Sequence, residues 1–422
     1  MSKEMHNTHQ NTHHSVIIIG GGLVGGLTAL LLAKAGIQAT VLDASPLLDA
    51  EKVLSQTNPR VLALNQASMH LMEQAGAWQH LQKFQRYQPY SGMQVWHRDG
   101  HGEIHFGQAS MTPPMPHDWL GIMVEPSVLN LALQTELQQK VQDYRTQVKV
   151  TRLEKLPQHW QVTLADGEVL TTDLIIGADG ANSFVRDQVG ILPDRLDYGQ
   201  TAVSCAIRTE KTHQHVARQI FLDTGPLAFL PMKSLDAEHQ GHWQSIVWTL
   251  PTDYADEYRE LNDQDFAKKV SQASHYMLGE VFEVVSRASF PLAARQAQSY
   301  VTDGVALVGD AAHVIHPLAG QGVNLGCLDA AVLVDQLIKD HKRGAWAHIQ
   351  TLRKYEHQRR LHNSLMMHSM SGLGWINITQ LRPLQWLRNE AVHFVANQQN
   401  AVDFFSVQAS GVPALKDTQY AI

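Results

Sequence analysis

The sequence predicts an α/β fold: a Rossmann-like nucleotide-binding domain, an inserted substrate domain built on a mainly antiparallel β-sheet, and a helical C-terminal region. Three observations lead to this prediction. A strand–turn–helix–strand unit lies at residues 15–45, and a second strand–turn–helix unit follows far downstream at 301–326. The chain between them is rich in short strands with alternating apolar residues, which is typical of an antiparallel sheet.

The first unit carries a dinucleotide-binding pattern. An apolar strand at residues 16–19 meets Gly20, Gly22 and Gly25, which have the spacing GxGxxG, and an Ala/Leu-rich helix follows. In such a unit the first glycine makes a tight turn, the second leaves room for a pyrophosphate, and the third lets the helix pack closely on the strand. The next strand ends in Asp43, whose carboxylate can accept hydrogen bonds from ribose hydroxyls. The alternative is a glycine-rich turn without a ligand, which leaves the terminal acid unexplained.

The downstream unit places a carboxylate and a glycine-rich turn at the entrance of a helix. An apolar strand at residues 305–308 runs into Gly309-Asp310, and an apolar helix starts near Asn324. The carboxylate at the strand end can accept hydrogen bonds from a polyol chain, and the free N–H groups of the helix start stabilise an anionic ring. A reduced flavin has both features. The segment therefore predicts a flavin whose reactive end lies here.

Local patterns place further elements along the chain. Hairpins are expected around Asp99-Gly100 and Asp166-Gly167, because strands with alternating apolar residues flank each of these turn pairs. Further strands are expected at 201–208 and 245–249, and helices at 126–145, at 263–280 and from 328 to about 408, with breaks near 372–374 and Pro383.

The cofactor domain is predicted to be discontinuous, because the two nucleotide-binding units must meet on one ligand. We expect a cofactor-binding domain over 15–82, 118–186 and 299–340, a substrate-binding sheet over 83–117 and 187–298, a helical region over 341–422, and a disordered tail over 1–14.

Composition narrows the class of protein. Of the 422 residues, 17% are charged and 44% apolar, and the net charge is −7, so the chain is a folded protein without the basic field that nucleic acid requires. Its two cysteines, Cys205 and Cys327, favour a reduced, cytoplasmic setting. The N-terminal tail holds four histidines; a metal-binding tail is the alternative to a solvated one, and no metal site is predicted elsewhere. No apolar run is long enough to span a membrane.

A third segment, LIIGADGANSFVR at 174–186, places Asp179-Gly180 after an apolar strand, with Asn182 or Ser183 as the cap of a helix. Alone it is an ordinary strand–turn–helix unit. In this order and spacing, the three segments resemble those of the single-component FAD-dependent aromatic hydroxylases. The resemblance extends over nearly the whole chain. A narrower resemblance, to the bacterial ubiquinone-biosynthesis hydroxylases, rests on 120–125, 197–203, 225–231, 245–248 and 309–326. Segments 92–100 and 207–221 look most like the branch that hydroxylates polyprenylphenol at ring carbon 5.

The resemblance implies a role for particular residues. The cofactor-binding positions, taken from the FAD pyrophosphate through the ribose and ribityl groups to the flavin N1–C2=O edge, are Gly20, Gly22, Gly25, Arg60, Asp179, Asp43, Asp310, Gly320, Gln321, Gly322 and Asn324. Arg60 has the alternative of a surface arginine, and Asp179 that of a purely structural carboxylate. One departure is Pro126 after Glu125, where the family usually has asparagine, so a flavin contact from that position is not expected.

The resemblance also implies the chemistry. The expected activity is hydroxylation of a polyprenylated phenol by a flavin C4a-hydroperoxide formed with O2, in ubiquinone biosynthesis and at ring carbon 5, with NAD(P)H or a protein as the electron donor. Hydroxylation at carbon 6 or 1 and a non-catalytic polyprenyl-binding flavoprotein are the alternatives. A catabolic phenol hydroxylase or a flavin halogenase is a further enzyme alternative, of which the halogenase is disfavoured because the WxWxIP motif is missing.

Partners and pocket follow from the same resemblance. The flavin carries the chemistry, so no catalytic side chain is required, and His316 and Pro317 could line the pocket. For His313 and His316, which flank the turn beside the flavin, a structural role is favoured over proton transfer. Apolar residues such as Met93, Leu227 and Phe229 are candidate walls or plain core. A lipid-soluble substrate leaves open a peripheral contact with the inner membrane and with other proteins of the pathway.

Overall fold

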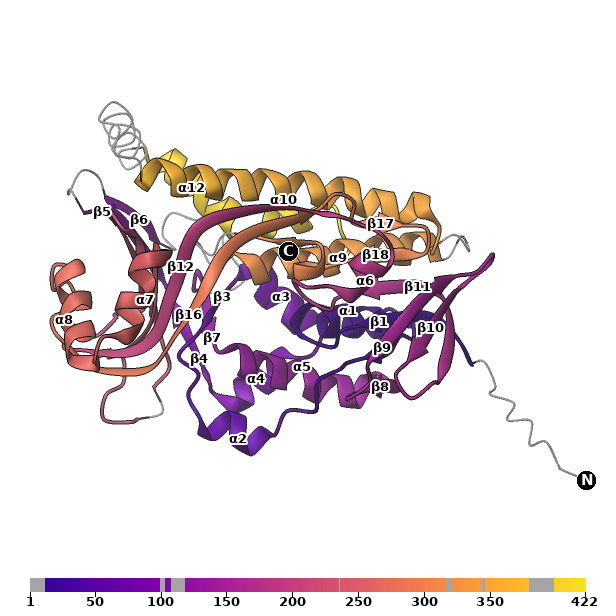
Figure 1. Cartoon of the computed structure of the whole chain (residues 1–422), viewed down its shortest axis with the longest axis horizontal. Coiled ribbons are helices and arrows are strands. Elements are labelled where there is room, and N and C mark those ends of the chain that lie inside the picture. Colours follow the sequence, from indigo (N-terminus) through magenta and orange to yellow (C-terminus); the bar gives the residue numbers. More distant parts are fainter. Residues whose placement is uncertain are drawn as a thin grey trace, which may run out of the picture.

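Two large β-sheets lie side by side and divide the protein into a nucleotide-binding half and an antiparallel half (Figure 1). The computed structural model describes residues 12–98, 103–107, 118–234, 236–315, 321–341, 343, 346–378 and 398–422. A third, three-stranded sheet has the strand order β3-β7-β4. The predicted fold class is confirmed.

The nucleotide-binding sheet has the strand order β17-β18-β11-β1-β2-β8, with β9 and β10 attached to β11. Its neighbours β18, β11, β1, β2 and β8 pair in parallel. The strands are β1 (Thr12–Ile19), β2 (Thr40–Leu42), β8 (Asp143–Arg145), β9 (Val150–Lys155), β10 (Trp160–Leu164), β11 (Val169–Gly177), β17 (Val301–Thr302) and β18 (Val305–Leu307).

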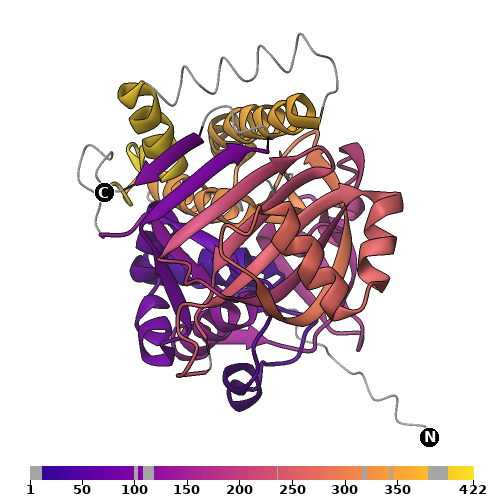
Figure 2. The same ribbon diagram turned by 90° about the vertical axis from the view of Figure 1, so that its left-hand side faces the viewer.

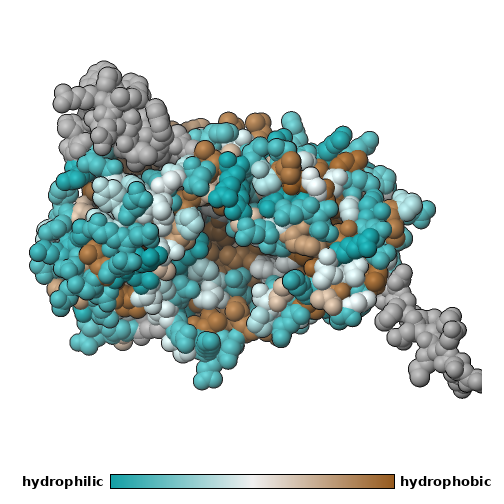
Figure 3. Space-filling view, viewed as in Figure 1, coloured by the Kyte–Doolittle hydropathy of each residue, from teal (hydrophilic) through white to brown (hydrophobic). Residues whose placement is uncertain are grey.

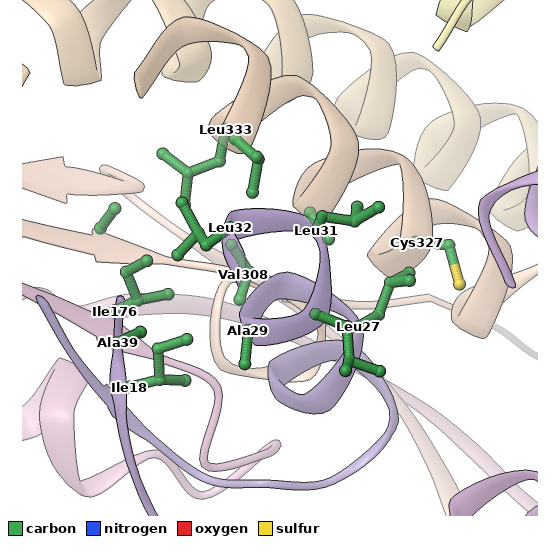
Figure 4. Packing of buried hydrophobic residues seen from close by; sticks show 14 of the residues in the cluster. Ile18, Leu27, Ala29, Leu31, Leu32, Ala39, Ile176, Val308, Cys327 and Leu333 are labelled. Atoms are coloured by element: carbon green, nitrogen blue, oxygen red, sulfur yellow. The ribbon is translucent and has the colours of Figure 1, made fainter. Parts of the chain in front are cut away.

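Helices cover this sheet because its strands are apolar on both faces. Figure 4 shows Leu27, Leu31 and Leu32 of α1 (Leu23–Lys34) in the packed core with residues of the sheet and of α9 (Gly322–His341). The other helices of this half are α2 (Ala50–Ser55), α3 (Gln66–Gln74), α4 (Trp78–Phe84), α5 (Pro126–Lys140), α6 (Phe184–Gln188) and the 3-10 helix η2 (Gly309–Ala311).

The second large sheet has the order β19-β16-β12-β15-β14-β13-β5-β6 and is antiparallel except where β13 pairs with β5. Its strands are β5 (Gly92–His97), β6 (Glu103–Gly107), β12 (Pro193–Thr209), β13 (Val216–Leu222), β14 (Gly225–Pro231), β15 (Trp243–Pro251), β16 (Val281–Ala297) and β19 (His313–Val314). Strands β12 and β16 have 17 residues each and arch from one half of the protein to the other (Figure 1).

The two faces of the antiparallel sheet have different neighbours. Helices α7 (Thr252–Glu260) and α8 (Asp263–Ala273), drawn in salmon, lie on its outer face in Figure 2. The inner face packs on the small sheet formed by β3 (Leu62–Asn65), β4 (Tyr87–Tyr90) and β7 (Gly121–Val124). Leu227 and Phe229 belong to the outer core under α7 and α8, so these two candidate wall residues are plain core, whereas Met93 packs in the inner cluster.

The C-terminal region is helical, with α9, α10 (Ile349–Ile378), α12 (Gln399–Ala409) and the 3-10 helix η4 (Val412–Leu415). The predicted break near 372–374 is wrong, because α10 continues through both glycines. A glycine costs a helix interior about 1 kcal/mol but still donates its N–H, so it need not end the helix. The other predicted break, at Pro383, lies outside the described residues. Within the described ranges, no helix has the length and apolarity that crossing a membrane requires.

Several predicted boundaries need correction. Residues 12–14, expected in the disordered tail, extend β1, where His14 Nδ1 lies 2.7 Å from Thr40 Oγ1. The helix expected at 126–145 ends at Lys140, and β8 takes its last residues. The helix expected at 263–280 ends at Ala273. Strand pairing takes the last residues of the first helix, whereas the second helix is followed by turns in which His275, Tyr276 and Gly279 have positive φ. Sequence periodicity reports neither feature.

Both predicted hairpins have antiparallel strands in the structure. β10 and β11 flank Gly167, whose φ of 91° requires a glycine, and β5 pairs with β6. The turn Asp99-Gly100 lies outside the described residues.

The cysteines are free thiols in separate cores, and burial raises the pKa of both to about 12.

Candidate active site

The predicted binding residues follow neighbouring parallel strands. Asp310 comes after β18, Asp179 after β11, Gly20 after β1 and Asp43 after β2, and these strands are adjacent in that order. Because parallel strands end at the same edge of the sheet, the structure brings the four residues to one edge. Ligands of open α/β sheets bind outside this edge.

The glycine turn after β1 is shaped by the backbone of its neighbours. Gly20 has a φ of +102°, and a Cβ atom there would lie 2.4 Å from the carbonyl oxygen of Ala178. A Cβ on Gly25 would lie 1.9 Å from the carbonyl oxygen of Gly20, so no other residue fits without moving the backbone. At Gly22, by contrast, no described atom lies within 4 Å of that position. This open space at the start of α1 is what a pyrophosphate needs.

Asp43 orients this glycine turn. Its Oδ2 accepts a hydrogen bond from the N–H of Gly21 at 2.8 Å, and its Oδ1 accepts one from the N–H of Ser45 at 2.7 Å. Burial, and to a smaller extent the charge of Asp43, raises the pKa of the neighbouring Tyr144 to about 12. The predicted contact of Asp43 with a ribose stays a prediction.

Asp179 makes hydrogen bonds within its own motif. Its carboxylate accepts from Ser183 Oγ at 2.5 Å and from the N–H of Val185 at 3.0 Å, so it holds the first turn of α6. Ser183, not Asn182, is the N-cap. Its role towards a cofactor stays a prediction.

Arg186, buried behind that turn, joins two of the motifs. It follows Asp179 in the third motif, and its guanidinium donates to the carbonyl oxygen of Ala311 at 3.2 Å. The sequence placed this arginine in a helix but gave no sign of its partner, which lies 125 residues away.

Asp310 is the carboxylate most open to a ligand. Its side chain is solvent-accessible, yet desolvation by the surrounding protein raises its pKa, and the charges of His313 and Arg60 only partly offset this rise. An accessible carboxyl group with that much protein around it lies in a recess. It is therefore an acceptor that a polyol chain can reach.

Arg60 lies on an exposed loop whose backbone is held by buried charges. Its guanidinium lies over the ring of Phe290 in β16, 5.4 Å from the centroid. Glu125 accepts from the N–H of Asn58 at 2.6 Å and pairs with buried Arg86 at 2.5 Å. Neither Arg86 nor this role of Glu125 was predicted, because nothing in the sequence shows that two distant charges are buried together.

The departure at Pro126 is explained by this arrangement. Glu125 is the N-cap residue of α5 and Pro126 is its first residue, a position where a missing N–H costs no hydrogen bond.

The first N–H groups of α9 have no acceptor within the helix itself, as at the start of any helix. Gly322 is its first residue, and among the described residues nothing lies within 4 Å of its Cβ position. Asn324 is buried: its Oδ1 accepts from the N–H of Asn65 and from Ser68 Oγ, and its Nδ2 donates to the carbonyl oxygen of Ala63. The side chain of Asn324 thus anchors α9. Its predicted contact with the flavin stays a prediction, and because the side chain is already hydrogen-bonded, that contact would come from the backbone.

The remaining predicted residues are less informative. Gln321 is partly exposed just before α9, and its Oε1 lies 3.4 Å from Asn324 Nδ2. Gly320, His316 and Pro317 lie outside the described residues.

An apolar space lies between the two halves of the protein. Figure 3 shows the surface hollowed there, with apolar residues inside the hollow. A cavity of about 110 Å³, here called the inter-sheet cavity, is lined by Thr57, Pro59, Ala206, Met232, Lys233, Ser234, Asp236, Trp243 and Val285. A larger cavity of about 300 Å³ is lined in part by Trp248 and Tyr258 of the outer core. It therefore lies on the outer face of the antiparallel sheet, away from the strand ends of the nucleotide-binding sheet.

These residues fit FAD. The open position at Gly22 suits the pyrophosphate, the accessible carboxylate of Asp310 suits the ribityl chain, and the free N–H groups at Gly322 suit the flavin ring. Bound there, FAD would supply the redox chemistry with O2.

Comparison with known proteins agrees with this fit. A family model described as an FAD binding domain matches residues 13–369. The 3-demethoxyubiquinol 3-hydroxylase of Escherichia coli (strain K12) is 36% identical over 386 residues, covering 90% of this chain and 94% of that protein. Ubiquinone hydroxylase UbiL of Rhodospirillum rubrum is 34% identical over 355 residues, covering 83% and 79%. Among solved structures, p-nitrophenol 4-monooxygenase PnpA from Pseudomonas putida DLL-E4 has the same fold, with a TM-score of 0.74 at 17% identity over 94% of this chain and 98% of that one.

Adding one methyl group should affect stability at Gly25 and cofactor binding at Gly22. Gly25→Ala forces a methyl group into a carbonyl oxygen and should destabilise the apo-protein by about 1–3 kcal/mol or more. Gly22→Ala meets only open space, so its free energy of unfolding should stay within about 1 kcal/mol while FAD binding is lost. Urea unfolding and FAD fluorescence titration measure the two effects. Normal FAD binding by Gly22→Ala would contradict the assignment.

Asp310→Asn should separate cofactor affinity from stability. The folded-state pKa lies above the unfolded value of about 4, so the ionised carboxylate opposes folding at neutral pH. The apo-variant should therefore be at least as stable as the parent at pH 7, and the difference should vanish as the pH falls to about 4. FAD should bind about 10-fold more weakly, because a neutral amide is a weaker acceptor. A less stable apo-variant at pH 7, or an unchanged FAD affinity, would speak against this role.

Proposed function

We propose that this chain, which belongs to the family of FAD-dependent ubiquinone-biosynthesis hydroxylases, hydroxylates a polyprenylated phenol at ring carbon 5. It is an FAD-dependent monooxygenase by family. The observation that carries the substrate assignment is the inter-sheet cavity, because a prenyl group contributes about 0.8 kcal/mol for each CH2 that it buries in an apolar space.

One loop connects this cavity to the cofactor site. Pro59 lines the cavity, and the next residue is Arg60, whose charge acts on Asp310. Ser245 of β15 donates to the carbonyl oxygen of Pro59 at 2.5 Å, which ties the loop to the antiparallel sheet. A phenol in the cavity would thus lie beside the recess that suits the flavin.

The protein's own groups would bind, orient and exclude water rather than transfer protons. The free N–H groups of α9 would hold negative charge on the ring edge, and Asp310 would hold the ribityl chain. The apolar lining of Ala206, Met232 and Val285 would keep water from the reacting ring.

The electron donor and the cellular setting are part of the proposal. We infer NAD(P)H as donor from the class. A peripheral membrane contact stays a prediction; α10 exposes Leu361 and Leu365 beside Arg360, a combination that suits a lipid surface.

A second candidate differs in the ring position. The Escherichia coli relative is named for the 3-hydroxylation of 3-demethoxyubiquinol, and its 36% identity over most of both chains favours that substrate. The two candidates share the cofactor, the fold and the cavity, so only the product distinguishes them.

Expression in host strains that each lack one ring hydroxylase should decide the position. In the strain without the carbon-5 enzyme, we expect restored ubiquinone and loss of the accumulated polyprenylphenol by mass spectrometry. Rescue only of the strain without the 3-demethoxyubiquinol 3-hydroxylase would support the second candidate. Persistent intermediates in every strain, with FAD-loaded protein in the cell, would contradict both.

Filling the inter-sheet cavity should lower turnover without weakening FAD binding. Val285→Phe places a larger side chain at the cavity wall and should reduce kcat/KM for the prenylated phenol about 10-fold. Val284→Phe is the matched control, because Val284 is the preceding residue of β16 and packs in the outer core. Both changes add the same volume, at a stability cost of about 1–3 kcal/mol. Equal effects of the two variants on kcat/KM would count against substrate binding in the cavity.

A further inference from the structure

A fully buried carboxylate, Asp329 of α9, lies behind the cofactor-binding turn. Its Oδ1 accepts from Arg359 Nε at 2.8 Å and from Asn363 Nδ2 at 3.1 Å. Its Oδ2 accepts from the N–H of Gly309 at 3.2 Å and lies 2.5 Å from His313 Nε2. Four groups from two other segments of the chain therefore converge on one side chain.

Asp329 contacts the turn on both sides of the predicted ribityl-binding residue, Asp310. Gly309 directly precedes Asp310, and His313 follows it by three residues, so Asp329 holds the turn on both sides of Asp310. Arg359 and Asn363 belong to α10, which has no other part in the predicted site. Asp329 thus links α10 to the residue that faces the ribityl chain.

We propose that Asp329 is a positioning residue for FAD: by holding Gly309 and His313 it orients the carboxylate of Asp310 towards the ribityl chain, while Arg359 of α10 orients Asp329. The proposal rests on FAD as the cofactor, not on the identity of the aromatic substrate.

The charges of this cluster favour a positioning role. Burial acts most strongly on Asp329 and would raise its pKa, but the charges and hydrogen bonds of His313 and Arg359 outweigh it and lower the pKa to about 2. Asp329 therefore stays ionised at every working pH. Two buried ions seldom add net stability over apolar residues of the same volume, so such a pair is better explained by the geometry that it imposes.

The ring of His313 is held from a second side. Tyr300 stacks on it with 5.9 Å between ring centroids and an interplanar angle of 29°. The Tyr300 hydroxyl lies 3.4 Å from Asn363 Nδ2, which itself donates to Asp329. These contacts fix the orientation of the imidazole, and the imidazole in turn fixes the conformation of the turn at residues 309–313.

A pair of substitutions in α9 tests this proposal. Asp329→Asn removes the charge with little change in size. Asp340→Asn is the matched control, because Asp340 lies on the same helix and also binds α10, accepting from Thr351 Oγ1 at 2.6 Å and Lys354 Nζ at 2.8 Å, but makes no contact with the turn. Both variants should lower the Tm of the apo-protein, since each weakens the contact between α9 and α10.

Only Asp329→Asn should change the bound cofactor. We expect at least a 30-fold rise in the FAD dissociation constant and an altered visible circular dichroism spectrum of the bound flavin, with neither effect in Asp340→Asn. An unchanged dissociation constant and spectrum in Asp329→Asn, or equal changes in both variants, would overturn the proposal.

A second variant covers the case in which Asp329→Asn does not fold. His313→Leu removes one donor from the turn but leaves the ion pair between Asp329 and Arg359 intact, and it should weaken FAD binding at least 10-fold. FAD binding equal to that of the parent would overturn the proposal. If the parent itself does not bind FAD, the cofactor assignment fails, and the positioning role fails with it.

Discussion

The parallel pairing of β1 between β11 and β2 is the constraint on which the rest of the site depends. This register, with Ile19 opposite Gly177 and Leu42, sets the glycine turn, Asp179 and Asp43 at one edge. β18 adds Asp310 to the same edge through its pairing with β11. No one of the three motifs makes a cofactor site by itself; the strand order does.

A second constraint joins this edge to the antiparallel half. The long strands β12 and β16 reach across the protein. The loop that carries Arg60 is held at two adjacent residues: the N–H of Asn58 donates to Glu125, and the carbonyl oxygen of Pro59 accepts from Ser245. The same loop lines the inter-sheet cavity. The cavity and the cofactor recess therefore keep a defined spacing, as the proposed hydroxylation requires, since the aromatic ring would have to meet the flavin without water.

The sequence predicted those parts of the molecule that depend on local patterns. The glycine turn, the Asp310 turn, both hairpins and the fold class are readable because each depends on residues close together in the chain. Partnerships between distant residues were not readable: Asp329 with Arg359, Arg86 with Glu125, and the use of the Asn324 side chain on β3. The helix break predicted at 372–374 failed because a glycine weakens a helix without ending it.

A crystal structure of the protein with FAD would test the proposed site most directly. We expect the pyrophosphate over Gly22, the ribityl chain hydrogen-bonded to Asp310, and the flavin ring at the start of α9 beside the inter-sheet cavity. FAD bound elsewhere, or bound at the strand ends with its ring turned away from α9, would contradict it.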